Sequence, residues 1–111
     1  MIPQVHDIAG LSAKSDSYWN DAVAAVNDHV VRMSIMTQPY HWHQHPDSDE
    51  TFLVLEGVLE IEFENGSIRL SPGQIATVPA GTVHVTRPLT ARTVNLTVER
   101  AGAATLATET H

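Results

Sequence analysis

Short segments of strand-like alternation, each ended by glycine, proline or asparagine, are the feature of this 111-residue sequence that most constrains its fold. In residues 58–64 apolar side chains alternate with three glutamates, so one face of this segment would be dry and the other wet. The Asn65-Gly66 pair after it predicts a hairpin with a type I′ turn, which needs positive φ at both central residues. The other predicted strands are residues 22–26 and 29–36, joined as a hairpin through Asn27-Asp28, and residues 52–55, 67–70, 75–78, 83–87 and 92–98. Short strands at this regular spacing predict an all-β sandwich or barrel.

The rest of the chain carries weaker structural signals. Residues 8–14 can form about one helical turn, so little helix is expected, and only near the N-terminus. Residues 101–111 are rich in alanine and threonine with few large apolar side chains, and we expect a flexible C-terminal arm there. The length suits one domain with one modest core. We therefore predict a single domain over residues 1–111 with its core in about residues 22–98.

Charge and composition argue against several functional classes. The formal net charge is −7 and no stripe of lysine or arginine is visible, which disfavours binding to nucleic acid or to an anionic membrane. There is no cysteine, so a metal ion would have to be held through nitrogen and oxygen atoms. Residues 1–10 lack the pattern of a signal peptide, and no apolar run approaches membrane-spanning length. A cytoplasmic location is the resulting expectation.

Histidines and carboxylates gather in residues 41–50, His-Trp-His-Gln-His-Pro-Asp-Ser-Asp-Glu. Because His43 and His45 are two apart, they would face the same side of a strand, and both imidazoles can tilt onto one ion. A short turn can bring a carboxylate, Glu50 or the adjacent Asp49, back over that ion, and His84 would add a third imidazole from a separate strand. Such ligands suit one divalent ion (Mn, Fe, Ni, Co or Zn) and leave two positions open on a six-coordinate metal.

The same residues resemble the two sequence motifs of the cupin family, over residues 42–87. The matching positions are His43-x-His45, Glu50 and Gly57 in the first motif, and Gly73, Pro79-x-Gly81 and His84 in the second. The resemblance implies a double-stranded β-helix, a jelly-roll barrel, with His43, His45, Glu50 and His84 as metal ligands. The motif spacing favours Glu50 over Asp49. Thr37 and Pro88 stand where the motifs usually have glycine and asparagine, which questions local turn geometry but not the ion site.

Further residues are candidates for a pocket beside the ion. His41 has the strand parity of His43, so we expect it to point inward and to act as an acid or base, or as a pocket wall. Apolar packing competes with pocket contact for the large side chains, and a solvated surface competes with carboxylate recognition for arginine. The predicted substrate-pocket residues are Met33, Trp42, Phe52 and Arg87.

Two functions are compatible with these features. The first is a metal-dependent enzyme that acts on a small oxygen-rich molecule, as a dioxygenase, isomerase or decarboxylase according to the metal, with Lewis-acid activation at the ion. The second is a non-catalytic module that binds or senses a metal or a small ligand. Cupins include both classes, so resemblance of fold cannot choose between them. Because small barrels of this kind commonly pair and edge strands need covering, we also predict a homodimer.

Overall fold

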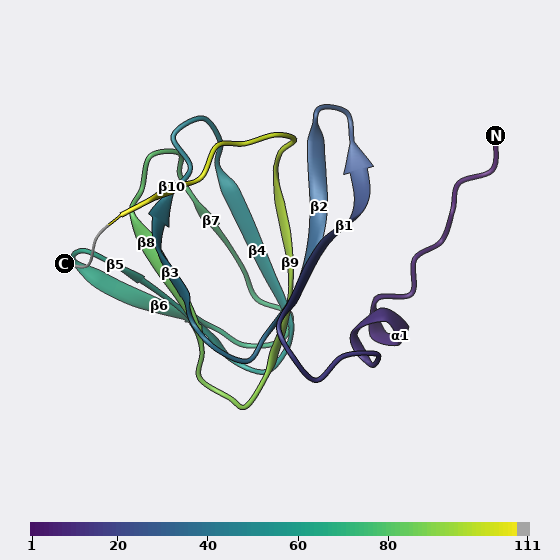
Figure 1. Cartoon of the computed structure of the whole chain (residues 1–111), viewed down its shortest axis with the longest axis horizontal. Helices are drawn as coiled ribbons and strands as arrows, with labels where there is room; N and C mark the ends of the chain where they lie inside the picture. Colours follow the sequence, from purple (N-terminus) through teal and green to yellow (C-terminus); the bar gives the residue numbers. More distant parts are fainter. Residues whose placement is uncertain (109–111) are drawn as a thin grey trace.

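Ten strands and one short helix form in residues 1–108, the part of the chain described by the computed structural model (Figure 1). Their bounds are α1 Ile8–Ser12, β1 Trp19–Val26, β2 His29–Met36, β3 Tyr40–Gln44, β4 Glu50–Glu56, β5 Leu59–Phe63, β6 Gly66–Leu70, β7 Ile75–Val78, β8 His84–Pro88, β9 Thr93–Arg100 and β10 Leu106–Ala107. The prediction of an all-β chain with little helix near the N-terminus is confirmed. No helix among these residues is long and apolar enough to cross a membrane.

The strands make two five-stranded antiparallel sheets that face each other (Figure 1). One sheet has the order β1-β2-β9-β4-β7 and the other the order β10-β3-β8-β5-β6. Since strands that are distant in sequence are neighbours in both sheets, the chain winds between the sheets as a double-stranded β-helix. The jelly-roll barrel implied by the sequence is therefore confirmed.

The two predicted hairpins both form, and one of them has a different turn. In the β1–β2 hairpin Val26 pairs with His29, and Asn27 in the loop adopts a φ of 53°. In the β5–β6 hairpin Phe63 pairs with Gly66, so the two loop residues are Glu64 and Asn65. Asn27 is the only non-glycine residue with positive φ in residues 1–108, so the predicted type I′ turn at Asn65-Gly66 is wrong.

Gly57 marks the point where the chain leaves one sheet and enters the other, between β4 and β5. Its φ is +76°, and a Cβ atom there would collide with the Arg92 carbonyl oxygen and the Thr90 hydroxyl. Only glycine fits both the backbone conformation and the space. This crossing places β4 opposite β5 across the barrel and not beside it.

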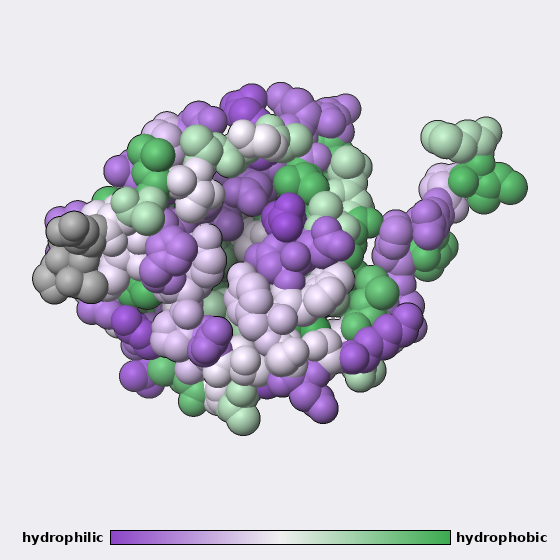
Figure 2. Space-filling view, viewed as in Figure 1, coloured by the Kyte–Doolittle hydropathy of each residue, from purple (hydrophilic) through white to green (hydrophobic). Residues whose placement is uncertain are grey.

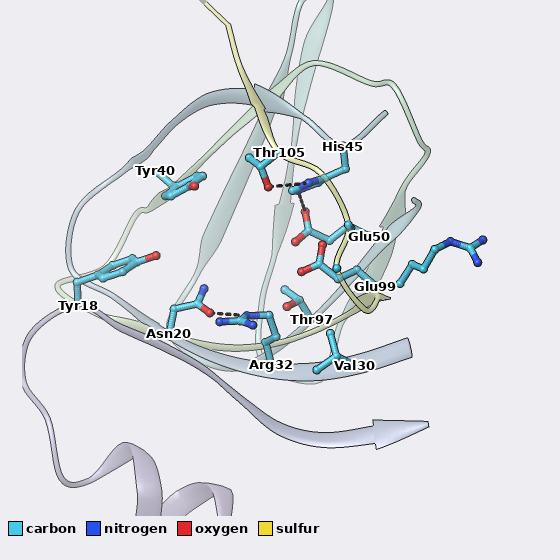
Figure 3. Close-up of a pocket in the computed structure, with 13 residues that line it drawn as sticks. Tyr18, Asn20, Val30, Arg32, Tyr40, His45, Glu50, Thr97, Glu99 and Thr105 are labelled. Carbon is cyan, nitrogen blue, oxygen red and sulfur yellow. Dashed lines mark hydrogen bonds and ion pairs between the residues drawn. The ribbon is translucent and has the colours of Figure 1, made fainter. Parts of the chain in front are cut away.

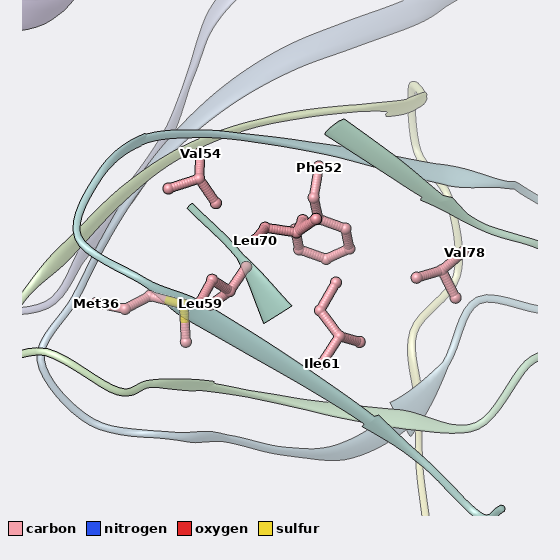
Figure 4. Packing of buried hydrophobic residues seen from close by; sticks show 7 residues of the cluster. All are labelled: Met36, Phe52, Val54, Leu59, Ile61, Leu70 and Val78. Atoms are coloured by element: carbon pink, nitrogen blue, oxygen red, sulfur yellow. The ribbon is translucent and has the colours of Figure 1, made fainter. Parts of the chain in front are cut away.

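The apolar core fills one end of the space between the sheets (Figure 4). Its buried members are Met36, Phe52, Val54, Leu59, Ile61, Leu70 and Val78, which come from both sheets. Burial of apolar side chains contributes about 1.5–3 kcal/mol for each one, so this cluster is the main support of the barrel. The other end of the interior is lined by polar residues, and the candidate site lies there.

A second apolar cluster lies on the outer face of the first sheet. Its buried members are Met33, Ile35 and Val94. Ile8 and Leu11, both in α1, pack against them. Met33 therefore faces away from the barrel interior, and its predicted position in a substrate pocket is wrong. Both faces of β2 carry apolar residues, so alternation alone did not show which face is the inner one.

Residues 101–108 lie against the barrel instead of forming the expected arm. β10 pairs with β3 through Leu106–Gln44 and Ala107–His43, and the Thr108 amide donates to the Trp42 carbonyl oxygen. In Figure 1 this segment crosses from the end of β9 to the edge of β3. The part of the predicted arm in residues 109–111 lies outside the described residues.

Candidate metal centre

Four side chains converge at the polar end of the barrel: His43, His45, Glu50 and His84. One ligand-type atom from each lies within 4.8 Å of the corresponding atoms of the other three, and all four residues are buried. His43 on β3 is the cross-strand partner of His84 on β8, whereas His45 follows β3 and Glu50 begins β4. The structure thus brings together the four residues that the sequence motifs indicated as metal ligands.

Backbone carbonyl groups fix the orientation of all three imidazoles. The Nδ1 atoms of His43 and His84 lie 2.8 Å from the carbonyl oxygens of His41 and Thr82. His45 Nδ1 lies 3.1 Å from the carbonyl oxygen of Ala104. A carbonyl oxygen only accepts, so each Nδ1 carries the proton, and in a neutral ring the lone pair is on Nε2. Histidines that bind metals are held by outer partners in this way.

The inward-facing atoms of the cluster have no hydrogen-bond partner outside it within the described residues. Glu50 Oε1 lies 3.2 Å from His45 Nε2 and 3.5 Å from His84 Nε2, and Figure 3 shows the His45–Glu50 contact. These three atoms are buried without a contact of hydrogen-bond geometry in residues 1–108. Three such atoms aimed at one point fit a divalent cation bound through nitrogen and oxygen.

The pKa values of the cluster residues indicate which of them are already deprotonated, as a metal ligand must be. Burial lowers the pKa of His43 to about 4, so its ring is neutral at pH 7. Burial would raise the pKa of Glu50, but contact with His45 and His84 lowers it to about 2. The same contact with Glu50 raises the pKa of His45 to about 9. Without another cation, the His45 imidazolium neutralises the buried carboxylate.

Asp49, the alternative carboxylate, has a structural contact outside the cluster. Its Oδ1 accepts the Ala80 amide at 2.8 Å, and the residue is exposed. It thereby ties the start of β4 to the turn that precedes His84. Glu50 is the carboxylate that points inward.

The family follows from comparison with known proteins. Residues 31–98, more than half of the chain, match the family described as the cupin domain. The chain belongs to the cupin family.

One relative is similar to this cupin in sequence, and two solved structures share its fold. The uncharacterized protein YdbB of Bacillus subtilis (strain 168) is 45% identical over 95 residues, which cover 85% of this chain and 83% of YdbB. A cupin-2 domain protein from Shewanella frigidimarina shares the fold at a TM-score of 0.76 and 25% identity, covering 86% of this chain and 93% of its own. A double-stranded β-helix protein from Klebsiella pneumoniae aligns at a TM-score of 0.79 and 23% identity, covering 97% of this chain and 100% of its own. These relatives support the fold and leave the activity open.

His41 does not point into the barrel of this cupin. Between β3 and β8, Tyr40 pairs with Thr86 and His43 pairs with His84, so β3 contains one extra residue. Such a bulge reverses the side-chain parity on one side of it. Tyr40 therefore lines the interior and His41 is exposed. The predicted inward orientation of His41 is wrong, and its expected role in acid–base chemistry loses its structural basis.

A cavity of about 370 Å³ reaches the cluster at His45 and Glu50 (Figure 3). Its wall is mostly polar, and hydrophilic residues surround the hollow visible in Figure 2. Arg32 and Glu99 enter it from β2 and β9, the two strands that pair along the opposite wall. Neither residue was predicted from the sequence, because a charged side chain on a strand usually lies on the solvated face.

The remaining predicted pocket residues have different positions. Phe52 lines a smaller cavity of about 60 Å³, which shares Tyr18 and Tyr40 with the larger one. Arg87 is paired with Glu60 and Glu62 at 2.8 Å and 2.6 Å, so it lies among the acidic residues of β5. Trp42 lines neither cavity. Of the four, only Phe52 lines either cavity, and the smaller cavity that it lines contains none of the four cluster residues.

Proposed function

We propose that this cupin holds one divalent metal ion per chain through His43, His45, Glu50 and His84, and that it transforms a small oxygen-rich molecule beside the ion. The observation that carries the proposal is that ligand-type atoms of four buried residues lie within 4.8 Å of one another, and that, in the described part of the chain, Nε2 of His45 and His84 and Oε1 of Glu50 have no hydrogen-bond partner outside this group. Mn, Fe, Ni and Zn all suit three imidazoles and a carboxylate. A bound ion of this kind supplies Lewis acidity that polarises a substrate oxygen.

The protein's own groups prepare the centre. The carbonyl groups of His41, Thr82 and Ala104 set the ring orientations, so little rearrangement is needed for the Nε2 atoms to meet a cation. His45 and Glu50 also line the 370 Å³ cavity, so a small molecule in the cavity reaches the ligand atoms directly. This access distinguishes a reactive centre from a purely structural one.

Glu99 favours catalysis over simple binding. It is the cross-strand partner of Glu50 and lines the same cavity. Burial, with Glu50 nearby, raises the pKa of its carboxyl above the usual value of 4.5. A carboxyl with a raised pKa holds its proton more readily than an exposed glutamate does, so it can serve as an acid or a base. We assign to Glu99 the proton-transfer role that the sequence suggested for His41.

The experiment begins with protein made without a histidine tag. Its metal content is measured, and protein loaded with Fe(II), Mn(II), Ni(II) or Zn(II) is then tested on diketones, catechols, thiols and hydroxy acids. We expect about one ion per chain and turnover with at least one pairing, weakened in Glu99→Gln. The matched control is Glu56→Gln, since Glu56 lies on β4 but pairs with Arg92 on the surface.

Each proposal has an outcome that contradicts it. Less than half an ion per chain after loading would refute the metal centre. One ion per chain with tight ligand binding but no turnover would favour the non-catalytic module. The homodimer and the cytoplasmic location stay predictions, and light scattering at micromolar concentration tests the first.

A further inference from the structure

Arg32 stands apart from the other arginines of residues 1–108. Arg69, Arg87, Arg92 and Arg100 each have a carboxylate within ion-pair distance. Arg32 has none, although acidic residues outnumber basic ones by 13 to 6 in the sequence. A guanidinium with no carboxylate at ion-pair distance inside a polar cavity is a candidate binding group for an anion.

The guanidinium of Arg32 is also held in place. Its Nε donates to Asn20 Oδ1 at 2.7 Å, and both side chains line the 370 Å³ cavity (Figure 3). The terminal Nη groups make no hydrogen bond or ion pair within the described residues. An Asn that fixes Nε leaves the two Nη donors free to bind a carboxylate.

The charges around Arg32 permit one anionic group. Glu99 faces the same cavity from β9, yet no ion pair joins it to Arg32. Arg100, at the rim, is paired with Asp28. With a divalent ion bound, the ion and Arg32 carry three positive charges against two negative charges from Glu50 and Glu99. A single substrate carboxylate would neutralise the difference.

Asn95 provides a second, independent indication of the ligand. It is fully buried on β9, lines the smaller 60 Å³ cavity, and its Oδ1 has no hydrogen-bond partner. Its Nδ2 donates to Thr93 Oγ1 at 3.3 Å, so the amide orientation leaves Oδ1 as the unused acceptor. Ser34 and Thr97 line the same small cavity. A ligand hydroxyl is the donor that fits such a lining.

We propose that the substrate is a small polyhydroxy carboxylic acid, whose carboxylate binds Arg32 and whose hydroxyl donates to Asn95. This inference rests on the metal-dependent function proposed above and names the chemical class of its substrate. Arg32 is then the residue that selects acids over neutral polyols, and Asn20 is the residue that positions it.

The test uses three six-carbon probes: gluconate, the neutral polyol glucitol and hexanoate, which lacks hydroxyl groups. Binding to the Zn(II)-loaded protein is measured by calorimetry, with zinc content determined for every sample. Wild-type protein is expected to bind gluconate about tenfold or more tighter than either other probe. Because this comparison needs no variant, it holds even if a substitution prevents folding.

The variants assign the selectivity to residues. Arg32→Gln is expected to weaken gluconate binding about 10- to 100-fold and to leave glucitol unchanged, with Arg32→Lys in between. Arg69→Gln removes the same charge from an exposed site and is expected to change nothing. Asn95→Leu is expected to reduce the preference for gluconate over hexanoate about tenfold.

The inference is overturned if wild-type protein does not bind gluconate at about 10 mM, or binds glucitol equally well. It is also overturned if Arg32→Gln behaves like Arg69→Gln. An unchanged preference in a folded Asn95→Leu variant would remove the hydroxyl contact. The metal function fails separately, through loss of stoichiometric zinc from wild-type protein, so the two failures are distinguishable.

Discussion

Binding of a metal ion should release one proton from His45, and the size of this effect follows from the structure. The contact with Glu50 raises the pKa of His45 to about 9, so Nε2 is protonated at pH 7 and must lose that proton to bind a cation. His43 and Glu50, with pKa values of about 4 and about 2, are already deprotonated. The proton on His45 therefore competes with the metal ion for Nε2.

The expected change of metal affinity with pH distinguishes His45 from a histidine with its usual pKa. With a pKa of about 9, His45 is about 90% protonated at pH 8, so about 0.9 proton leaves per ion bound. Metal affinity rises with pH as the proton is lost, by about 50-fold between pH 7 and pH 9, and levels off above pH 9. A histidine with its usual pKa near 6.5 would change the affinity by less than about 1.5-fold over that range.

Calorimetric titration with Mn(II) in buffers of different ionisation enthalpy counts the protons, and electron paramagnetic resonance of free Mn(II) gives the affinity. Glu50→Gln removes the carboxylate that holds the proton, so its proton release at pH 8 is expected to approach zero. His29→Gln removes an exposed imidazole paired with Asp28 and should leave the release unchanged. A wild-type release below about 0.3 proton at pH 8, with an affinity that does not vary with pH, would refute the reasoning.

Three further predictions concern the bulge, the support of His45 and the core. His41→Gln should keep about one metal ion per chain, because the His41 side chain is exposed, whereas His43→Gln should lose the ion. Equal metal loss in the two variants would mean that the bulge is wrongly placed. Asp47→Ala should weaken metal binding about tenfold, because the Asp47 carboxylate accepts a hydrogen bond from the Ala104 amide and so positions the Ala104 carbonyl group that orients His45. Asp21→Ala, at an exposed site, is the control, and equal metal affinities in the two variants would contradict the account. Leu59→Ala should lower the free energy of unfolding, measured by urea denaturation, by about 2–5 kcal/mol, since the Leu59 side chain is fully buried. Ile68→Ala, at a partly exposed position on β6, should lower it by about 1 kcal/mol or less. Similar losses in the two variants would place the core elsewhere.

Local patterns in the sequence were sufficient to predict most strands. The alternation in residues 58–64 and the turn residues around residues 75–78 depend on neighbours in the chain, and β5 and β7 form there. The metal-type cluster was also predictable, because His43, His45, Glu50 and His84 belong to motifs with fixed spacing. These features needed no knowledge of how distant strands pair.

What could not be predicted depends on pairing between distant segments. The bulge that turns His41 outward is a property of the β3–β8 ladder and leaves no mark in β3 alone. β10 has two residues, and its position is set by β3, about sixty residues earlier in the chain. Met33 was misplaced because both faces of β2 are apolar enough to be the inner one. Arg32 and Glu99 were missed for the complementary reason, since a charged side chain on a strand is usually solvated.

The most direct test of the account is a crystal structure of the metal-loaded protein, with the ion located by its anomalous scattering. We expect one ion per chain, about 2.0–2.3 Å from the Nε2 atoms of His43, His45 and His84 and from a Glu50 carboxylate oxygen, with an open side toward the Arg32 cavity. An ion bound at other residues, or an empty cluster in crystals grown with excess metal, would contradict it.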